Sequence, residues 1–580
     1  MTIKENLETS GVKRSSSVRS QVLLTLATLF CLLPFSGKAF HIDDPLFLWS
    51  AKQITKHPLD PYGFQLIWYR TWMPMAEVTK NPPLACYYAA VIGAVAGWSE
   101  RALHLGFLLP ALAAVLGTYH LARRFTQSPL VAAAATLLTP GILVSATSVM
   151  CDTMMLAFWM WAVAFWLEGL ESGKQGRLLV SGLLIAAAAL TKYFGICLVP
   201  LLFVYSLLRQ RRLGIWALYF AVPILVLGGY QAWTNALYGH GMFSDALSYG
   251  PQRLAEARFA VLLYPLVCAS FVGGCALSAI TLAPAVWPRK YLVGALLLAS
   301  VAFGLGWIVL GRHLHATHTG TVLQQRWWTV GPTLVLFIAG GVSVLALAGK
   351  DFWEHRDADS LLLAVWVLGT FVFTAFLNWT INARSVLPLI PAAGIILARR
   401  LDALGITSVK PLQVKTAIAL FVSGFVSLWI AQADAGLANS AKQAAMLISE
   451  RTRNEVGAVW FQGHWGFQYY MQQLGVQPFD FNTTLNRGDL VIIPPGDYTI
   501  HAPPAQFVVY DDLLEMPLRQ PVMTMRAAME AGFYGSFFGA LPFSFGTVTP
   551  ESYHVLHMGA KLQPQQWLRP GREQGAAVEP

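Results

Sequence analysis

The sequence predicts an α-helical polytopic membrane protein with about thirteen transmembrane helices, followed by a soluble α/β domain on the extracytoplasmic side. Three observations predict this class. Of the 580 residues, 55% are hydrophobic and only 12% are charged, and the mean hydropathy is +0.51, which is too apolar for a soluble chain of this length. Apolar runs long enough to cross a bilayer recur along most of the chain. Between these runs the basic residues stand in short clusters, as they do in cytoplasmic loops.

In this interpretation the chain has three parts. Residues 1–19 are polar, Ser-rich and basic, and form a cytoplasmic tail. Residues 20–432 form the transmembrane domain, which includes a first extracytoplasmic loop over residues 39–100, and residues 433–580 form the extracytoplasmic domain. The expected spans are residues 20–38, 102–121, 129–147, 153–170, 178–191, 194–208, 214–233, 259–283, 292–311, 330–348, 360–378, 385–400 and 416–432.

Charge fixes the sidedness of these spans. An apolar helix over residues 84–98 could be taken for a second span, but Arg123 and Arg124 would then lie outside. If the helix lies in the interface instead, this pair and every later basic cluster fall inside. We therefore expect an interfacial helix, a cytoplasmic N-terminus and an extracytoplasmic C-terminal domain. The short loops favour the inner (plasma) membrane of a bacterium.

Residues 433–580 differ in character from the rest. Their polarity is ordinary, and residues 459–466 and 490–495 form strand-like runs bounded by Gly and Pro. These runs predict a small mixed α/β domain.

Composition also excludes some functions. The net charge of +10 comes from loop clusters, so we expect no nucleic-acid partner. The six cysteines lie in or beside apolar segments without C-x-x-C spacing, which indicates core residues and no disulfide framework or cysteine metal site. We find no convincing internal repeat, which argues against many secondary transporters.

Acidic, basic and aromatic residues gather at the extracytoplasmic ends of the expected spans. Two adjacent acids follow the first span, and because charges are costly in lipid they must face water or a polar cavity. The candidate acids are Asp43, Asp44 and Asp152, and the candidate binding residues are Lys80, Lys192, Tyr193, Arg253, Arg258 and Arg384.

Such a set has a chemical logic. A carboxylate at the interface is able to act as a general base or to bind a divalent metal ion. Lys and Arg nearby suit a phosphate head group whose hydrocarbon tail stays in the bilayer. The combination suits transfer of a sugar from a lipid carrier. The motif His313-x-His315-x-x-His318 does not have the spacing of a helical ligand pair, so we name no metal ligands.

The order of these motifs resembles a known family. An acidic pair in the first outer loop is followed by Pro82-Pro83-Leu84 with aromatics, by a lone acid opening a later helix, by Thr191-Lys192-Tyr193, and by the segment 384–392, Arg-Ser-Val-Leu-Pro-Leu-Ile-Pro-Ala. Over residues 20–400 the chain is similar to the protein O-mannosyltransferase and aminoarabinose lipid A transferase group. These are polytopic GT-C glycosyltransferases that use polyprenyl-phosphate sugars.

The resemblance implies roles for three residues. Asp43 corresponds to the leading acid of the family's pair and is the catalytic candidate, Asp152 corresponds to the second acid, and Arg384 to the basic residue of the Arg-x-x-x-Pro-x-x-Pro motif. The chain departs from some relatives at Lys80-Asn81, where they carry Glu-Lys before the proline pair. It departs from the lipid A enzymes at Leu46, where these often have a basic residue, so the acceptor stays open.

Our leading hypothesis is a membrane glycosyltransferase that moves a sugar from a polyprenyl-phosphate carrier to a lipid, glycan or protein acceptor at the extracytoplasmic face, with inversion at the anomeric carbon. The alternative is a transporter or flippase for a lipid-linked or anionic solute, and a third option is a sensor or scaffold led by the outer domain. Individual residues have simpler interpretations too. Asp152 could cap a helix, and Lys80 and Lys192 could be interfacial lysines that reach into water.

Overall fold

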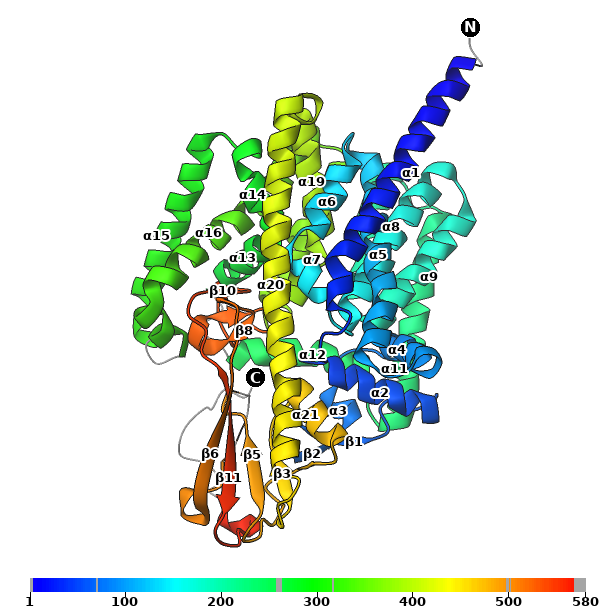
Figure 1. The fold of residues 1–580 in the computed structure, drawn as a ribbon. Coiled ribbons are helices and arrows are strands. Elements are labelled where there is room, and N and C mark those ends of the chain that lie inside the picture. The colour runs from blue at the N-terminus through cyan, green and yellow to red at the C-terminus, as the bar shows by residue number, and fades with distance from the viewer. Residues whose placement is uncertain are drawn as a thin grey trace.

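The computed structural model describes residues 4–68, 71–256, 263–314, 318–496, 500 and 502–567. Long helices stand side by side in a bundle, and a small sheet-containing part lies beyond one end of it (Figure 1). Among the described residues, eight helices are long and apolar enough to cross a membrane, or nine if one bent pair forms a single span. The fold class predicted from the sequence is confirmed, whereas the count of thirteen spans is not.

The helices of the bundle differ widely in length. Their bounds are α1 Lys4–Leu32, α5 Glu100–Phe125, α6 Pro129–Leu137, α7 Pro140–Ser145, α8 Cys151–Ser172, α9 Gln175–Thr191, α10 Leu198–Gln210, α11 Ala221–Tyr238, α13 Tyr264–Cys275, α14 Leu277–Val286, α15 Arg289–Leu314, α16 His318–His355, α17 Ala358–Phe376, α19 Leu389–Ala403 and α20 Lys410–Arg451.

Two of the expected spans are broken. The span expected over residues 129–147 consists of α6 and α7, because Pro140 lacks the N–H that a continuous helix needs. The span expected over residues 259–283 bends by 83° between α13 and α14. The sequence pattern of an apolar run does not reveal such breaks, since both halves remain apolar.

Small residues let these helices approach closely. A Cβ added to Gly273 on α13 would lie 1.9 Å from the carbonyl oxygen of Phe337 on α16, and one added to Gly341 would lie 2.0 Å from that of Ala269. Membrane helices associate largely through such close contacts, because lipid removes the hydrophobic driving force between them.

Helix α20 joins the bundle to the C-terminal part. Its 42 residues correspond to about 63 Å at 1.5 Å per residue, which is twice the thickness of a bilayer core. The helix runs through residue 433, where the sequence analysis placed a domain boundary, so bundle and C-terminal part are connected by continuous helix. The division of the chain into domains stays a prediction.

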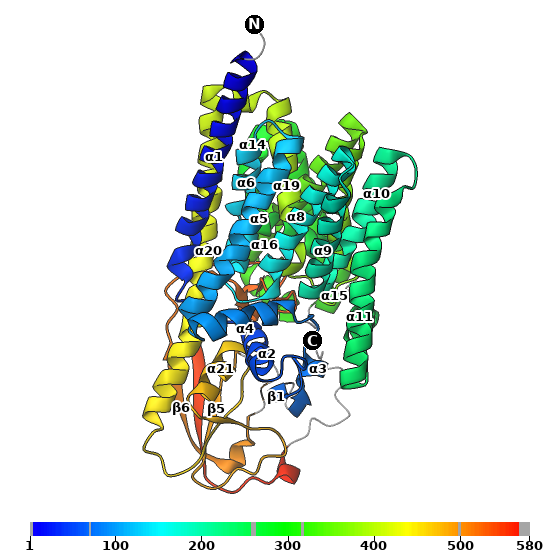
Figure 2. The same ribbon diagram turned by 90° about the vertical axis from the view of Figure 1, so that its right-hand side faces the viewer.

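A layer of short elements lies between the bundle and the C-terminal part (Figure 2). It contains α2 Asp44–Lys56, β1 Gln65–Trp68, β2 Thr71–Pro74, α3 Met75–Val78 and α4 Leu84–Ala96. The apolar helix expected over residues 84–98 is α4, and its Val91 and Val95 side chains are exposed. These exposed side chains suit a helix that lies in the membrane interface.

The C-terminal part has a mixed five-stranded sheet in the order β4-β3-β5-β11-β6. Strand β3 is parallel to β4 and β5, whereas β11 is antiparallel to β5 and β6. The bounds are β3 Val459–Phe461, α21 Trp465–Gln473, β4 Gln477–Pro478, β5 Leu490–Ile493, β6 Val508–Met516 and β11 Glu551–Met558. The predicted α/β character is confirmed, and β3 and β5 coincide with the two strand-like runs of the sequence.

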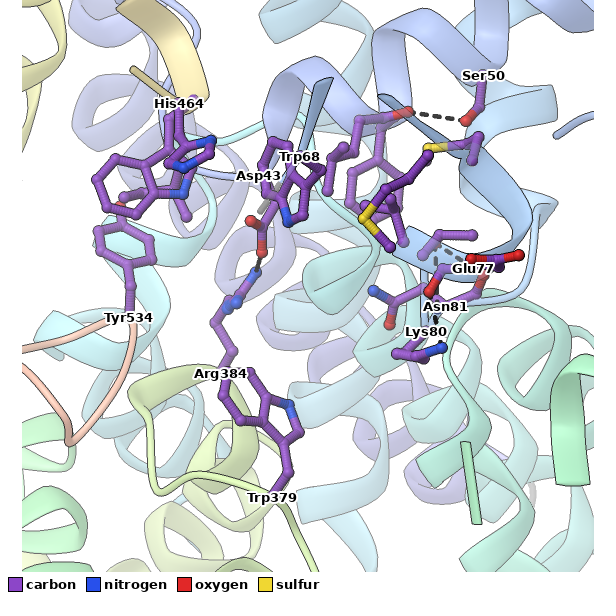
Figure 3. Close-up of a pocket in the computed structure, with 18 of the residues that line it drawn as sticks. Asp43, Ser50, Trp68, Glu77, Lys80, Asn81, Trp379, Arg384, His464 and Tyr534 are labelled. Atoms are coloured by element: carbon purple, nitrogen blue, oxygen red, sulfur yellow. Dashed lines mark hydrogen bonds and ion pairs between the residues drawn. The ribbon is translucent and has the colours of Figure 1, made fainter. Parts of the chain in front are cut away.

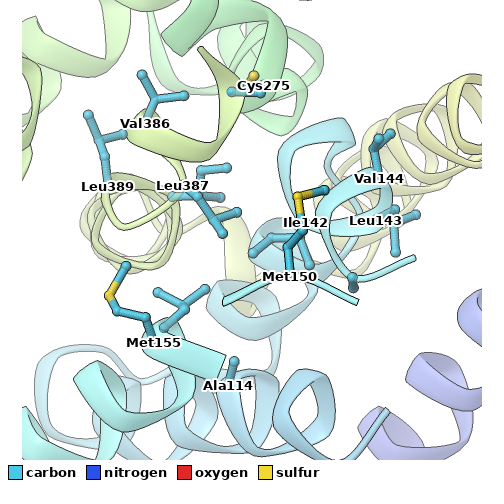
Figure 4. Close-up of a cluster of buried hydrophobic side chains, with 14 of the residues drawn as sticks. Ala114, Ile142, Leu143, Val144, Met150, Met155, Cys275, Val386, Leu387 and Leu389 are labelled. Carbon is cyan, nitrogen blue, oxygen red and sulfur yellow. The ribbon is translucent and has the colours of Figure 1, made fainter. Parts of the chain in front are cut away.

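An apolar core lies where α5, α7 and α8 meet α13 and the short helix α18 Ala383–Val386 (Figure 4). Leu143, Val144, Met155, Val386 and Leu387 are all fully buried in it. This core fixes the segments that carry Met150 and Arg384, and so it determines where the neighbouring polar side chains stand.

Candidate active site

Asp43 stands at the start of α2, at the end of a loop that is held on several sides. The backbone N–H of Ala39 donates to Asn439 Oδ1 at 2.9 Å, and that of Phe40 donates to the Tyr470 hydroxyl at 2.8 Å. Ile42 has φ of 49°, a left-handed conformation that is strained for a β-branched residue. The surrounding bonds therefore hold a strained backbone immediately before the acid.

The Arg384 side chain points toward Asp43 in the pocket (Figure 3). Its Nη1 lies 2.9 Å from Asp43 Oδ2. Arg384 is placed by α18, which begins where the Asn382 side chain accepts a hydrogen bond from the N–H of Ser385. The carboxylate and the guanidinium both line a cavity of about 510 Å³.

The surroundings keep Arg384 charged. Burial disfavours the guanidinium charge, but Asp43 and Asp152 outweigh burial and raise the pKa of Arg384. The ring of Tyr534 lies 5.9 Å from the guanidinium carbon and adds a cation–π contact. The cavity thus presents a fixed positive charge beside a carboxylate.

Charged and aromatic residues line the rest of this cavity. Lys80 is half-buried there; its Nζ donates to the carbonyl of Glu77 at 2.8 Å and lies 5.6 Å from the centre of the Tyr249 ring. Burial lowers the pKa of Lys80, although Asp245 and Glu77 oppose this effect. The other polar or aromatic lining residues are Phe47, Ser50, Trp68, Thr71, Thr79, Asn81, Trp379, His464, Trp465, Tyr534, Phe537 and Phe538.

Asp44 does not line the cavity. It is fully buried and accepts hydrogen bonds from the backbone N–H groups of His41, at 2.9 Å, and Val149, at 2.8 Å. Burial raises the pKa of Asp44 to about 7, although Lys38 and these bonds act in the opposite direction. Its observed contacts join two loops beneath Asp43, and a catalytic role for it stays a prediction.

Asp152 and Lys192 form an ion pair of 2.6 Å next to the cavity. Asp152 lies in the first turn of α8, and Met150 holds the N-cap position, so the helix-cap interpretation of Asp152 is wrong. Tyr193 donates to the hydroxyl of Tyr230 at 3.2 Å. None of these predicted residues lines the cavity itself. Asp152 acts on the site electrostatically, because its charge raises the pKa of Arg384.

Two predicted binding residues and the histidine motif lie wholly or partly outside the described residues. Arg258 and His315 lie outside the described residues. Arg253 falls within helix α12 Met242–Glu256, but its side chain is outside the described part of the structure, as are those of His313 and His318.

The sequence analysis missed Glu77, Tyr534 and the aromatic cluster of the cavity. Glu77 is on α3, three residues before Lys80, so its closeness in sequence to a candidate residue was a usable signal. Nothing in the sequence indicated Tyr534, which lies in an irregular segment 150 residues beyond Arg384. Only the fold brings its ring against the Arg384 guanidinium.

A metal site finds little support among the described residues. They contain no group of three or more His, Cys, Asp or Glu side chains that could hold an ion. Asp43 and Glu77 are the acids that line the cavity in this part of the chain. The divalent ion considered from the sequence stays a prediction, and no step below depends on it.

Comparison with known proteins supports the class of protein. Residues 80–228 match the model of the dolichyl-phosphate-mannose-protein mannosyltransferase family. No curated protein matches the chain in sequence. Together with the polytopic helical fold, the family match supports the resemblance to GT-C glycosyltransferases that the motifs predict.

The chain is also similar to several solved structures. The crystal structure of ArnT from Cupriavidus metallidurans bound to undecaprenyl phosphate has 15% identity and a TM-score of 0.46, over 82% of this chain and 93% of that one. The oligosaccharyltransferase AglB from Archaeoglobus fulgidus, in complex with an inhibitory peptide and a dolichol-phosphate, has 12% identity and a TM-score of 0.49, over 83% and 70%. The arabinofuranosyltransferase AftD from Mycobacteria has 12% identity and a TM-score of 0.39, over 94% and 40%.

Proposed function

We propose that this protein is a membrane glycosyltransferase that moves one sugar from a polyprenyl-phosphate carrier to a lipid, glycan or protein acceptor at the extracytoplasmic face. One observation carries the proposal: the carboxylate of Asp43 and the guanidinium of Arg384 meet in a cavity at the end of the helical bundle. The matching family model, over residues 80–228, points to the same reaction class.

In this proposal Asp43 is the general base. Its carboxylate takes the proton from an acceptor hydroxyl or amine as that atom attacks the anomeric carbon of the donor sugar. The bond between that carbon and the phosphate oxygen breaks, and its electron pair leaves with the polyprenyl phosphate. A single displacement of this kind inverts the configuration of the anomeric carbon.

Arg384 and Lys80 supply the positive charge that the leaving phosphate needs. Arg384 presents several N–H donors in a plane, which suits a phosphate with two accepting oxygens. Loss of one such stabilising donor costs about 3–4 kcal/mol of transition-state stabilisation in enzymes that depend on it. The hydrocarbon tail would remain between the helices, where apolar side chains replace water.

The alternative is a transporter or flippase that uses the same charges for binding only. Turnover in detergent separates the two, because a transporter leaves the sugar–phosphate bond intact. The purified protein would be given a polyprenyl-phosphate sugar with a radiolabel on the sugar, together with a mixture of lipid and glycan acceptors. We expect release of polyprenyl phosphate and transfer of the label, and intact donor after many hours would reject the glycosyltransferase.

A further inference from the structure

A second cavity of about 310 Å³ lies on the other side of α2 from the candidate active site. Its lining residues come from α2, the β1–β2 hairpin and α21, which lie near one another (Figures 1 and 2). Among the described residues, no carboxylate lines it. The lining residues are Trp49, Lys52, Gln53, Lys56, Phe64, Gln65, Leu66, Trp72 and Gln472.

Two separate stripes of residues along α2 line the two cavities, one stripe for each cavity. Residues 43, 46, 47 and 50 face the candidate active site, and residues 49, 52, 53 and 56 face the second cavity. Each set repeats at i, i+3, i+4 and i+7, which places its members on one side of a helix. The second stripe is offset by six residues, which turns it by about 120° around the helix axis.

Strand β2 of the hairpin also contributes side chains to both cavities. Thr71 and Met73 line the first cavity, and Trp72 between them lines the second, because side chains alternate across a strand. The Trp72 side chain is 50% exposed. An exposed indole in a cavity offers a large flat surface to the apolar face of a ligand ring.

Lys52 is held in position before any ligand arrives. Its Nζ donates to the Tyr469 hydroxyl at 3.3 Å and lies 5.1 Å and 5.7 Å from the centres of the Tyr469 and Trp98 rings. A lysine fixed in this way loses less side-chain entropy on binding than a free one. Lys56, one turn further along α2, is exposed and adds a second charge to the same stripe.

The chemistry of this lining suits one class of ligand. Two ammonium groups attract anionic groups, three amide side chains bond with hydroxyls, and the two indoles pack on rings. We propose that the second cavity binds the distal part of an anionic saccharide acceptor whose reactive hydroxyl reaches Asp43. This inference rests on the proposed function and specifies its acceptor.

The length of α2 sets the size of that acceptor. Trp49 is six residues from Asp43 and Lys56 is thirteen, which correspond to about 9 and 20 Å along the helix axis. A ligand that occupies both cavities must therefore extend beyond a single sugar ring, as an oligosaccharide or glycolipid head group does.

The test measures saccharide binding to the full-length protein in phosphatidylcholine nanodiscs by isothermal titration calorimetry. The probes are trigalacturonate and glucose 1,6-bisphosphate as anionic saccharides, and maltotriose as a neutral one. We expect an anionic probe to bind, Lys52→Gln/Lys56→Gln to weaken its binding at least tenfold, and Trp72→Ala to weaken it several-fold. Arg487→Gln/Lys561→Gln removes two exposed charges elsewhere in the C-terminal part and should leave binding unchanged.

Several results would overturn the inference. It fails if neither anionic probe binds, if maltotriose binds as tightly as trigalacturonate, or if the control pair weakens binding as much as the lysine pair. Two further titrations identify other sources of the negative charge. If inorganic phosphate alone binds as tightly as the saccharides, or if phosphatidylglycerol in the nanodisc displaces them through the two lysines, the site recognises phosphate or lipid head groups and no saccharide.

Failure of the acceptor inference can be told apart from failure of the proposed function. Asp43→Asn should lower the rate of sugar transfer about 10²- to 10⁴-fold and leave trigalacturonate binding intact, because Asp43 lies on the other stripe of α2. If sugar transfer depends on Asp43 but Lys52→Gln/Lys56→Gln binds trigalacturonate as tightly as wild type does, only the acceptor inference fails. If Asp43→Asn transfers sugar at the wild-type rate, the proposed function fails whatever the calorimetry shows.

Discussion

Arg384 Nη1 lies 2.9 Å from Asp43 Oδ2, although 341 residues separate the two in the chain. The pair places a carboxylate and a fixed positive charge in one cavity beside the membrane-spanning bundle. Removing one charge from such a pair leaves the other poorly compensated, so each partner is open to experimental test.

Replacing Asp43 with Asn should remove the base, while Asp152 still compensates part of the Arg384 charge. We expect kcat for sugar transfer to fall about 10²- to 10⁴-fold, which is the usual contribution of a positioned general base. The thermal unfolding midpoint should stay within a few degrees of wild type. Glu455→Gln, at an exposed acid in the C-terminal part, serves as the control and should keep full activity. Wild-type turnover by Asp43→Asn would assign the base to another residue.

Arg384→Lys tests the need for a planar donor, because lysine keeps the charge but loses the fork. We expect kcat/KM to fall at least about 10²-fold, in line with the loss of one charge-stabilising donor. Combined with Asp43→Asn, the change should cost less than the sum of the two single effects, since both act on one step. The matched control is Arg399→Lys, in a buried pair with Asp351 at 3.0 Å near the other end of α19, and it should preserve kcat/KM.

The buried pair of Lys38 and Asp434 should be important for stability. Their side chains are 0% exposed and 2.6 Å apart, and Asp434 also accepts from Thr524 and Tyr534. Lys38→Met should lower the unfolding free energy by about 3–5 kcal/mol, because it strands a buried carboxylate.

A half-exposed pair provides the comparison for this prediction. Lys442→Met breaks a pair with Glu100 whose side chains are 34% and 18% exposed, and it should cost about 1 kcal/mol or less. The double variant Lys38→Met/Asp434→Leu should recover part of the loss. Chemical denaturation in detergent measures all three, and equal losses for the two lysines would contradict the prediction.

Asp44 should make stability depend on pH. Burial raises its pKa in the folded protein to about 7, from an ordinary value of 3.8, so the folded state favours the neutral acid. The stabilisation by the proton is fully present below pH 3.8 and is lost as the pH rises toward 7. Measured against Asp44→Asn, wild type should therefore be relatively more stable at pH 5 than at pH 8.

Taking the difference in stability between wild type and Asp44→Asn at each pH removes the contributions of other titrating groups. His41 is one of them, since burial lowers its pKa to about 4 and its effect runs in the opposite direction. Thermal unfolding of both proteins at the two pH values gives the result. A difference that stays constant with pH would show that Asp44 ionises normally in the folded state.

The proposed orientation is open to labelling. A cysteine introduced at Lys561 should react with a membrane-impermeant maleimide in cells with a permeabilised outer envelope and an intact inner membrane. One introduced at Arg211 should react only after the inner membrane is opened. Both positions are exposed, whereas the native cysteines are buried or half-buried and give a low background. The reverse pattern would place Asp43 on the cytoplasmic side.

Much of the architecture could be predicted because it depends on local composition. Apolar runs must be helical in lipid, where every backbone polar group needs an internal partner. The same reasoning identified α4 as a separate apolar helix and placed strands over residues 459–461 and 490–493. The count of thirteen spans is not confirmed. Hydropathy also does not show where a proline or a bend interrupts an apolar run, as between α6 and α7.

The sequence alone determined that Asp43, Lys80 and Arg384 are candidates, since charge next to an apolar segment must face water or a partner. Only the tertiary structure decided their partners: Asp43 pairs with Arg384 in the cavity, whereas Asp152 pairs with Lys192 beside it. It also decided that Asp44 is buried and that Tyr534 joins the site. The physical reason is that hydrophobic character is carried by each segment, but the distance between two charges depends on how the whole bundle packs.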